Sequence, residues 1–350
     1  MNVLALTRYG MLGPSTRVRF TQFGAELASS GIAIDHAPLL GDAHLRRLYA
    51  GRGRRPFAAL AAYARHALTA ARRRHDLVWV EKELLPYMPA WVERSLLAGT
   101  PYVVDYDDAT FHTYDQHPSQ AVRGLLGRKI ARVMRGAAAV VVGNEYLARY
   151  ARQAGVERVT VLPSVIDLDR YGPVVPPPPG PFTVGWIGSP GSERVLESFR
   201  EAAAEVTSWP DTRLVLVGAS PGALAGVPHE TWVWTEDSEV DAMRAFHVGI
   251  MPLPDLPWER GKCGFKLIQC MGVGRPVVAS PVGANADIVR DGVEGVHADG
   301  AASWVAALRR LRDDDASRER MGLAGRQRVE SEYSVQAVAP RLAELLTGTA

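Results

Sequence analysis

The sequence predicts an α/β protein built from two doubly wound parallel sheets. Short apolar runs alternate with helical patterns along the whole chain, which is typical of this class. The runs at Leu77–Glu81 and Tyr102–Asp105 are continuous rather than alternating, as expected of strands buried on both faces of a parallel sheet. A proline run interrupts the pattern, which then restarts. The 350 residues suit two domains of about 100–200 residues each.

In the first half, apolar runs and breaker residues set the expected elements. A helix is expected over Arg17–Ser30, because apolar residues recur at helical spacing and Gly31 suits the position after a helix end. A second helix is expected over Glu145–Ala154. Strands are expected at 2–7, 32–38, 77–81, 102–105, 138–142 and 159–162.

The domain boundary is expected at a proline run. Six of the nine residues in Pro173–Pro181 are prolines, so this stretch is stiff and cannot pair in a sheet. We therefore expect an N-terminal domain over 1–170, a linker over 171–181 and a second domain over 182–325. The final residues, 326–350, read as the end of an amphipathic helix.

The second half repeats the alternation of strands and helices. Strands are expected at 182–187, 213–217, 232–234, 248–251 and 276–279. Helical segments are expected at 193–206, 265–272, 287–290, 302–311 and 318–346.

Composition excludes several classes of protein. Two cysteines are too few for a disulfide framework or a cysteine-rich zinc site. No apolar run approaches the roughly 20 residues that span a bilayer. The first residues lack the basic leader and apolar core of a signal peptide, so a cytoplasmic location is expected.

The net charge of +2 conceals an uneven distribution. Residues 43–75 contain nine arginines and no Asp or Glu, so the rest of the chain is acidic. An arginine-rich helix with an apolar stripe can lie on an anionic membrane surface, here the inner face, and a solvated helix face is the alternative. No recognition motif for nucleic acid accompanies it. Only four basic residues are lysines, which makes each of them conspicuous.

The segment Gly261–Val289 contains the most specific motif. A Gly-Phe loop leads into a helix, then a turn with Met271 and Gly274, the strand 276–279, and finally Gly283 and Asp287. This pattern resembles the donor site of glycosyltransferase family 4, and 159–190 is similar to the domain crossover of that family. The resemblance implies a GT-B fold, two Rossmann-like domains facing across a cleft, whose last helix, 326–350, crosses back to the first domain. It also implies a retaining, metal-independent transferase with no cofactor beyond its nucleotide-sugar donor.

Two glycine loops form the expected phosphate site of the donor. The loop ending in Gly264 and Phe265 opens a helix whose N–H groups and dipole favour phosphate. Lys262 and Lys266 add positive charge there, and Lys266 is a catalytic candidate because it would stabilise the leaving diphosphate. Gly188 and Ser189 open a second loop, and Arg194 aligns with the phosphate-binding lysine of the family. The alternatives are a solvated loop with incidental lysines and an ordinary turn.

The chain departs from the family at several positions. The two glutamates of the family fall on Gly261 and Gln269. Gln269 can still bind a ribose through its amide, and Glu259 is a candidate replacement for the missing acid. Ser189 stands where the family has an arginine. Asp287 is expected to contact the base or the sugar, or simply to cap a helix.

The acceptor side is expected at the ends of the N-terminal strands. Asp105, Asp107 and Asp108 are close enough to raise one another's pKa, and we expect Asp107, which stands where the family has a histidine, or Asp108 to contact the acceptor hydroxyl. A Mg²⁺ site and a helix cap are the alternatives.

Four further residues are expected to line the acceptor side. Glu81 ends a buried strand, and Asn144 either contacts substrate or caps a helix. Arg17 and Arg19 would oppose the dipole at the start of their helix, which hints at an anionic ligand.

Together these features predict a retaining glycosyltransferase that moves a sugar from a nucleotide-diphosphate donor to an acceptor hydroxyl. The product would be a glycan, a glycolipid or a natural-product glycoside, and the acceptor can be anionic or lipid-linked. Two alternatives remain: a GT-B sugar-nucleotide epimerase, and a non-catalytic partner that binds a nucleotide sugar for an active transferase.

Overall fold

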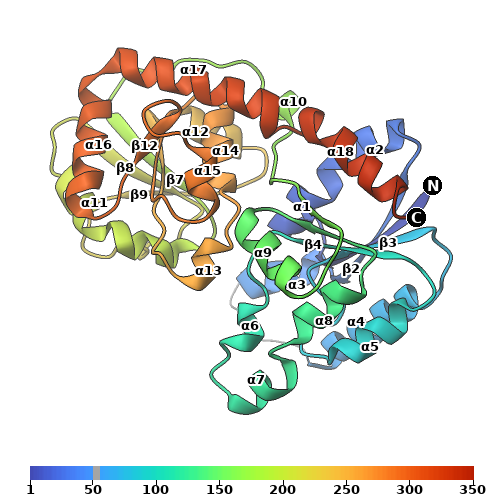
Figure 1. Ribbon diagram of the computed structural model, residues 1–350. Helices are drawn as coiled ribbons and strands as arrows, with labels where there is room; N and C mark the ends of the chain where they lie inside the picture. Colours follow the sequence, from blue (N-terminus) through green and yellow to red (C-terminus); the bar gives the residue numbers. More distant parts are fainter. Residues whose placement is uncertain (50–55) are drawn as a thin grey trace. The chain divides into compact units, whose positions relative to one another are not determined.

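The computed structural model describes residues 1–49 and 56–350, which divide into two compact units (Figure 1). The N-terminal unit contains Met1–Ser164 together with Val338–Ala350, and the C-terminal unit contains Val165–Ala337. Each unit contains one six-stranded parallel sheet, so the prediction of two doubly wound α/β domains is confirmed. The units change at Ser164–Val165, and the proline run therefore lies inside the C-terminal unit, just before its first strand.

The sheet of the N-terminal unit has the order β2-β1-β3-β4-β5-β6. The chain first runs outward to β2 and then returns past β1 to β3, so the order reverses between β1 and β3. The strands are β1 Asn2–Tyr9, β2 Ala33–Leu40, β3 Leu77–Glu81, β4 Tyr102–Tyr106, β5 Ala139–Val142 and β6 Val159–Val161. Every residue of β3, β4 and β5 is buried, which agrees with their apolar sequence.

The predicted helix Arg17–Ser30 is wrong in its start and its continuity. Helix α1 spans Pro14–Arg19, a 3-10 turn follows, and α2 spans Gly24–Ser29. A proline at the first helical position suits a helix start, because its missing N–H has no partner to lose there. Arg17 and Arg19 therefore lie in the last turn of α1, where a cation is favoured by the helix dipole, and the inference of an anionic ligand from an unfavourable dipole falls away.

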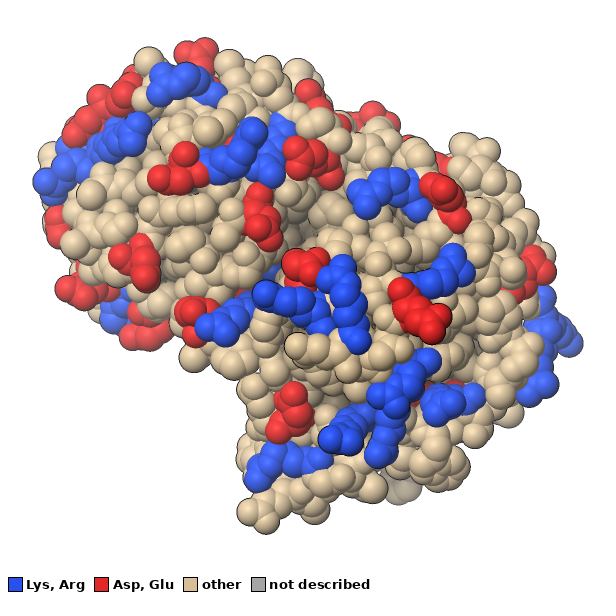
Figure 2. Space-filling model, viewed as in Figure 1, with Lys and Arg blue, Asp and Glu red and all other residues tan. Residues whose placement is uncertain are grey.

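The other helices of the N-terminal unit connect its strands. They are α3 Asp42–Tyr49, α4 Pro56–Ala70, α5 Ala90–Leu97, α6 His112–Asp115, α7 Gln120–Leu126, α8 Lys129–Gly136 and α9 Glu145–Gln153. Figure 2 shows Lys and Arg side chains gathered on this unit in the region of α5 and α8.

The sheet of the C-terminal unit has the order β12-β11-β10-β7-β8-β9, so its order reverses between β7 and β10. Its strands are β7 Phe182–Ile187, β8 Thr212–Val217, β9 Glu230–Trp232, β10 Val248–Met251, β11 Val277–Ala279 and β12 Gly295–His297. Separate apolar clusters occupy the unit, one around Phe246 and Met271 and another around Trp186 and Trp304.

The C-terminal unit contains more helices than the sequence predicts, and one predicted helix is divided. A break near Ser334 separates α17 from α18, and α18 enters the N-terminal unit from Val338 onward. The helices are α10 Leu168–Tyr171, α11 Arg200–Val206, α12 Glu239–Arg244, α13 Pro257–Arg260, α14 Phe265–Gly272, α15 Ala284–Ile288, α16 Ala301–Asp313, α17 Asp315–Glu332 and α18 Val335–Thr347. Among the described residues, no helix is long and apolar enough to cross a bilayer.

In doubly wound sheets, ligands bind outside the carboxyl ends of the strands where the strand order reverses. The fold therefore directs attention to the loops after β1 and β3 in one unit, and after β7 and β10 in the other.

His66, which is buried in α4, gives a test of the fold in solution. Burial and, to a lesser extent, the charge of the neighbouring Arg65 lower the pKa of His66 from 6.5 to about 4. Between pH 4 and pH 6.5 the unfolded chain binds more protons at His66 than the folded chain does. The contribution of His66 to the free energy of unfolding is therefore fully present above about pH 6.5 and is lost as the pH falls towards 4. We expect the change His66→Phe to remove up to about 3 kcal/mol of this pH dependence from the free energy of unfolding, measured by urea titration. An identical pH dependence in the variant would contradict the assignment.

Candidate functional site

The carboxyl end of the C-terminal sheet carries the predicted donor residues on three loops. The first loop is a closed turn after β7, in which the Ser192 N–H donates to the Ser189 carbonyl over 2.8 Å and the Ser189 N–H donates to Ser192 Oγ over 3.1 Å. A Cβ atom at Gly188 would lie 2.2 Å from the ring of Trp186. Only glycine therefore fits at the start of this turn.

The second loop runs from β10 to α14 and touches the third, which follows β11. Gly264, immediately before α14, has a φ of 64°, and a Cβ atom there would lie 2.2 Å from Ile288 in α15. Both the left-handed backbone and the close contact require glycine. Phe265, the first residue of α14, is half-buried against the core of the unit.

The predicted cations converge on these loops. The Lys266 ammonium lies 5.4 Å from the ring centroid of Trp186, the same ring that packs against Gly188. The Lys262 ammonium lies 5.9 Å from the ring of Trp258 in α13. The chain thus brings Lys262, Lys266 and the Gly188 turn to one end of the sheet.

Arg194 and Glu259 form an ion pair between the first two loops, with Nη2 and Oε1 3.0 Å apart. The Arg194 side chain is 66% exposed, whereas that of Glu259 is only 4% exposed. Glu259, the predicted replacement for the missing acid beside the sugar, therefore pairs with Arg194 in this structure. Its buried charge instead orients a cation that faces solvent.

Two other predicted donor residues take different positions. Gln269 is buried, and its amide nitrogen donates to the Tyr171 hydroxyl over 3.2 Å. This hydrogen bond ties α14 to α10 and engages the amide that was expected to bind ribose. Asp287 is exposed on α15, and its backbone carbonyl accepts from Arg328 over 2.9 Å.

Asn285, two residues before Asp287, is a site residue that the sequence did not indicate. It is fully buried, and its Nδ2 donates to the Ser280 carbonyl over 3.1 Å, while its Oδ1 has no hydrogen-bond partner among the described residues. This oxygen would lie 3.5 Å from a Cβ atom at Gly264, so it borders the start of α14. A buried acceptor without a partner is costly, and a ligand hydroxyl would satisfy it.

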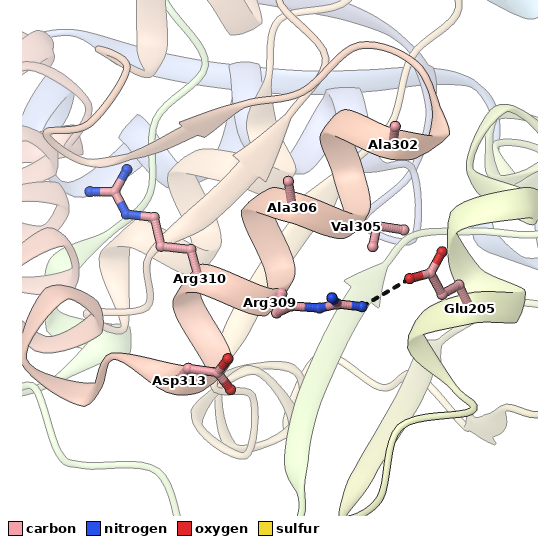
Figure 3. A pocket seen from close by; sticks show the side chains of 7 residues that line it. All are labelled: Glu205, Ala302, Val305, Ala306, Arg309, Arg310 and Asp313. Carbon is pink, nitrogen blue, oxygen red and sulfur yellow. Dashed lines mark hydrogen bonds and ion pairs between the residues drawn. The ribbon is translucent and has the colours of Figure 1, made fainter.

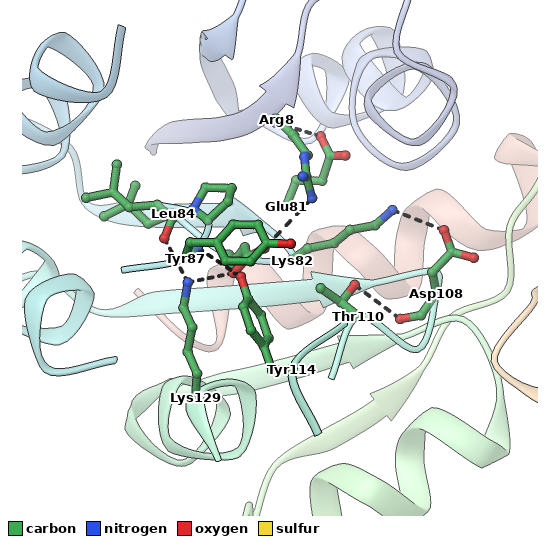
Figure 4. Close-up of polar contacts among 12 residues, drawn as sticks. Arg8, Glu81, Lys82, Leu84, Tyr87, Asp108, Thr110, Tyr114 and Lys129 are labelled. Atoms are coloured by element: carbon green, nitrogen blue, oxygen red, sulfur yellow. Dashed lines mark hydrogen bonds and ion pairs between the residues drawn. The ribbon is translucent and has the colours of Figure 1, made fainter. Parts of the chain in front are cut away.

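The carboxyl end of the N-terminal sheet brings predicted acidic residues next to a lysine, and Figure 4 shows Asp108 facing Lys82 there. Lys82, immediately after β3, lies 2.8 Å from Asp107 and 3.2 Å from Asp108, both of which follow β4. Asp107 and Asp108 therefore share one cation, Lys82, to which no role was assigned from the sequence. Among the described residues no group of His, Cys, Asp or Glu side chains could hold a metal ion, so the Mg²⁺ alternative gains no support.

Glu81, the last residue of β3, is buried next to Lys82. Its Oε2 accepts hydrogen bonds from the Arg8 N–H over 3.0 Å and from the Thr16 hydroxyl over 2.8 Å. Burial raises the pKa of Glu81 although the Lys82 charge opposes the rise. These contacts give Glu81 a role in joining β1, α1 and β3.

Arg19 is buried and binds Asp105 at the end of β4, so it does not lie on an open surface. Its guanidinium forms two hydrogen bonds to Asp105, over 2.9 and 3.2 Å, and donates to the carbonyls of Leu162 and Pro163, each over 2.8 Å. The prediction of an acceptor contact at Arg19 is corrected accordingly, because these partners surround a side chain that is 3% exposed. Arg17 is also buried, at the other end of the same turn.

Asn144 takes the simpler of its two predicted roles. Its Oδ1 accepts from the Leu147 N–H over 2.9 Å and caps α9. Asn144 is buried after β5, next to the strand that precedes Asp107.

A second lysine, Lys129, anchors the loop after β3 (Figure 4). Its ammonium lies 2.6 Å from Glu83 and 2.8 Å from Glu93, and all three side chains are buried. Glu93 in turn accepts from the N–H groups of Leu84 and Leu85 over 3.2 and 3.1 Å. The scarcity of lysine marked Lys129 in the sequence, but its partners come from separate elements and could not be read from spacing.

The C-terminal unit also has a surface depression between α11 and α16 (Figure 3). Glu205 and Arg309 face each other across it, 3.0 Å apart. The two helices pack against one face of the sheet, and the depression includes none of the loops at the carboxyl ends of the strands. Its lining is Glu205, Ala302, Val305, Ala306, Arg309, Arg310 and Asp313.

Comparisons with known families match both units. Residues 17–164 match the glycosyl transferase 4-like domain, and residues 181–314 match the family described as glycosyl transferases group 1. A stretch of 95 residues is 38% identical to D-inositol 3-phosphate glycosyltransferase of Thermomonospora curvata. This stretch spans 27% of the chain and only 22% of that relative.

Solved structures show the same two-domain fold. HepE of Anabaena in complex with UDP has a TM-score of 0.71 at 16% identity, and the alignment covers 99% of this chain and 100% of HepE. Sucrose-phosphate synthase of Thermosynechococcus elongatus has a TM-score of 0.74 at 17% identity, covering 99% and 98% of the two chains. WaaG, a glycosyltransferase involved in lipopolysaccharide biosynthesis, has a TM-score of 0.70 at 16% identity, covering 99% and 100%. The fold of the chain is thus that of GT-B proteins.

The Lys129 cluster predicts a large effect of one substitution. The change Lys129→Met leaves Glu83 and Glu93 buried without their cation, so we expect the free energy of unfolding to fall by about 3–5 kcal/mol in urea titration. Arg152, whose side chain is half-exposed and pairs with Glu145 at the surface, is the matched control. Arg152→Met should cost less than about 1 kcal/mol. Equal losses in the two variants would contradict the anchoring role of Lys129.

Proposed function

Because its two units match glycosyltransferase families, the chain is a glycosyltransferase, and we propose that it moves a sugar from a nucleotide-diphosphate donor to an acceptor hydroxyl with retention of configuration. The proposal assigns the donor to the C-terminal unit and the acceptor to the N-terminal unit. The bond from the anomeric carbon to the diphosphate breaks, and the acceptor oxygen forms the new bond to the same carbon.

The observation that carries the donor assignment is the convergence of Arg194, Lys262 and Lys266 at the end of β7 and β10. The diphosphate gains negative charge as it leaves, and cations fixed at that point stabilise it more in the transition state than in the ground state. The backbone N–H groups of the 188–192 turn and the start of α14 are further donors for phosphate oxygens. HepE was solved with UDP and with UDP-glucose, which supports a uridine nucleotide as the first probe.

As the contact for the donor sugar and ribose, we propose Asn285 Oδ1 in place of Gln269. Gln269 already donates to Tyr171, whereas Asn285 Oδ1 has no partner among the described residues and can accept from a hydroxyl. Asp287, exposed in the same helix, stays a candidate contact for the base or the sugar.

On the acceptor side we assign Asp107 and Asp108 to the acceptor hydroxyl. Both carboxylates follow the end of β4 beside the reversal of strand order, and their side chains are 15% and 25% exposed. They can accept a hydrogen bond from a hydroxyl while remaining fixed by Lys82. Both family matches are to transferases, so neither an epimerase nor a non-catalytic partner is favoured.

The donor assignment is tested by ligand-induced thermal stabilisation with UDP and a panel of nucleotide sugars. A ligand that binds the native state stabilises it by RT ln(1 + c/Kd), where c is the free ligand concentration, so the unfolding temperature rises with the logarithm of the ligand concentration once this exceeds Kd. We expect Lys266→Ala to weaken binding of the stabilising nucleotide by about 2 kcal/mol, roughly 30-fold, because a charge-assisted contact to phosphate is lost.

Arg309→Ala is the matched control for this test. Arg309 also lies over a tryptophan, 5.1 Å from the Trp209 ring, but it borders the α11–α16 depression. It should leave the affinity unchanged. If the control weakened binding as much as Lys266→Ala, the phosphate site would be misplaced. Stabilisation without release of the nucleoside diphosphate under any acceptor would favour a binding partner over an enzyme.

We further propose a peripheral contact of the N-terminal unit with an anionic membrane, at the cytoplasmic face. The outer side of α4 is apolar: Phe57, Leu60 and Leu68 are 85%, 70% and 65% exposed. Arg46 and Arg47 in α3 and Arg72, Arg73 and Arg74 after α4 supply positive charge near this face. Arg52, Arg54 and Arg55 of the same basic stretch lie outside the described residues.

Sedimentation with lipid vesicles tests this contact. The wild-type chain should bind vesicles containing phosphatidylglycerol and not vesicles of phosphatidylcholine alone, because both charge and apolar burial contribute. The triple change of Phe57, Leu60 and Leu68 to Ser should reduce binding at least tenfold. Trp91→Ser, which removes a 70% exposed aromatic residue from α5, shows whether the effect is specific to α4. Equal binding of the wild type and the triple variant would contradict the proposal.

A further inference from the structure

Lys82 occupies a position that the transfer reaction does not yet explain. We propose that Lys82 is the positioning residue of the acceptor side, which holds Asp107 and Asp108 in place. The acceptor role of these carboxylates rests on the proposed function, whereas their dependence on Lys82 can be measured without any substrate.

The contacts of Lys82 join three elements. Its ammonium lies 2.8 Å from Asp107 Oδ1 and 3.2 Å from Asp108 Oδ2, both beyond β4, and donates to the Ser15 hydroxyl in α1 over 3.0 Å. The residue is 9% exposed. These three partners, each at hydrogen-bonding distance, fix the ammonium. The ammonium in turn fixes the two carboxylates.

The backbone of Lys82 is strained. Its φ is 61°, a left-handed conformation that glycine and asparagine adopt at low cost and lysine does not. The Lys82 N–H donates to the Asp105 carbonyl over 2.8 Å, which holds the backbone in this conformation. Strain of this kind persists where the surroundings over-determine it, commonly at functional sites.

The charges around Lys82 explain how it controls the carboxylates. Burial lowers the pKa of Lys82, but the negative charges of Asp107, Asp108 and Glu81 outweigh burial and raise it above the usual value. Lys82 is therefore a cation throughout the neutral range. Its charge lies directly beside both carboxylates, and a neighbouring positive charge favours the ionised form of a carboxylate.

Other charged groups packed at this edge set the background. Asp105 is neutralised by Arg19, and Glu81 is enclosed by Arg8 and Thr16. Lys82 forms an ion pair with Asp107 and another with Asp108, so one substitution should affect both carboxylates together.

The test is a carboxyl ¹³C NMR titration of the full chain, with Asp107→Asn and Asp108→Asn used to assign the two signals. In Lys82→Met, we expect at least one of these carboxyls to titrate a full pH unit or more higher than in the wild type, a tenfold rise in proton affinity. Lys82→Arg retains the charge and should restore the wild-type titration to within half a unit. Unchanged titration of both carboxyls in Lys82→Met would overturn the proposal.

Two variants separate this effect from a change in folding. Lys82→Asn removes the ammonium but suits the left-handed backbone, so it should shift the titration as Lys82→Met does while remaining folded. Tyr87 has the same φ of 61° in the same loop, and Tyr87→Asn relieves comparable strain without removing the charge. A shift in Tyr87→Asn equal to that in Lys82→Asn would overturn the role of the ammonium.

The outcomes for this proposal and for the proposed function are independent. If the wild-type chain bound no nucleotide sugar, the transferase proposal would fail while the titration still reported on Lys82. If the donor bound and the titration of Lys82→Met were unchanged, only the positioning role would fail.

Discussion

Charge that is buried at the carboxyl end of a sheet must be paired, and this requirement shapes the N-terminal unit. Lys129 lies between Glu83 and Glu93, and Glu93 uses its remaining capacity to accept from the backbone of Leu84 and Leu85. The loop after β3 is consequently fixed along its length. Because that loop begins at Lys82, the position of the ammonium beside Asp107 and Asp108 depends on a pairing that lies deeper in the unit.

The C-terminal unit places its cations differently. Buried Glu259 compensates part of the charge of Arg194, but most of the Arg194 side chain faces solvent. Lys262 and Lys266 lie over tryptophan rings. One edge therefore holds its lysines between carboxylates, and the other places its lysines over aromatic rings. Although lysine is scarce in the sequence, the side chains of all four lysines lie at these two sheet edges.

Local sequence predicted the strands well because β3, β4 and β5 are apolar on both faces and need no distant partner to be recognised. It predicted the glycine loop before α14 and the convergence of Lys262 and Lys266 for a similar reason: their chemistry is contained within a few residues. It failed where a distant contact decides the outcome. Arg19 is occupied by Asp105 and by carbonyls that follow β6, and Gln269 by Tyr171 from α10. Neither partner can be found by counting along the chain. The start of α1 at Pro14 was a local signal that the helical periodicity obscured.

The central claim is that a donor diphosphate is held where the strand order of the C-terminal sheet reverses. A crystal structure of the chain with the nucleoside diphosphate that stabilises it most would test this claim directly. We expect the two phosphates to lie within hydrogen-bonding distance of the backbone N–H groups of the 188–192 turn and of the Lys266 ammonium. Phosphates bound elsewhere, for example in the depression between α11 and α16, with the turn and Lys266 unoccupied, would contradict it.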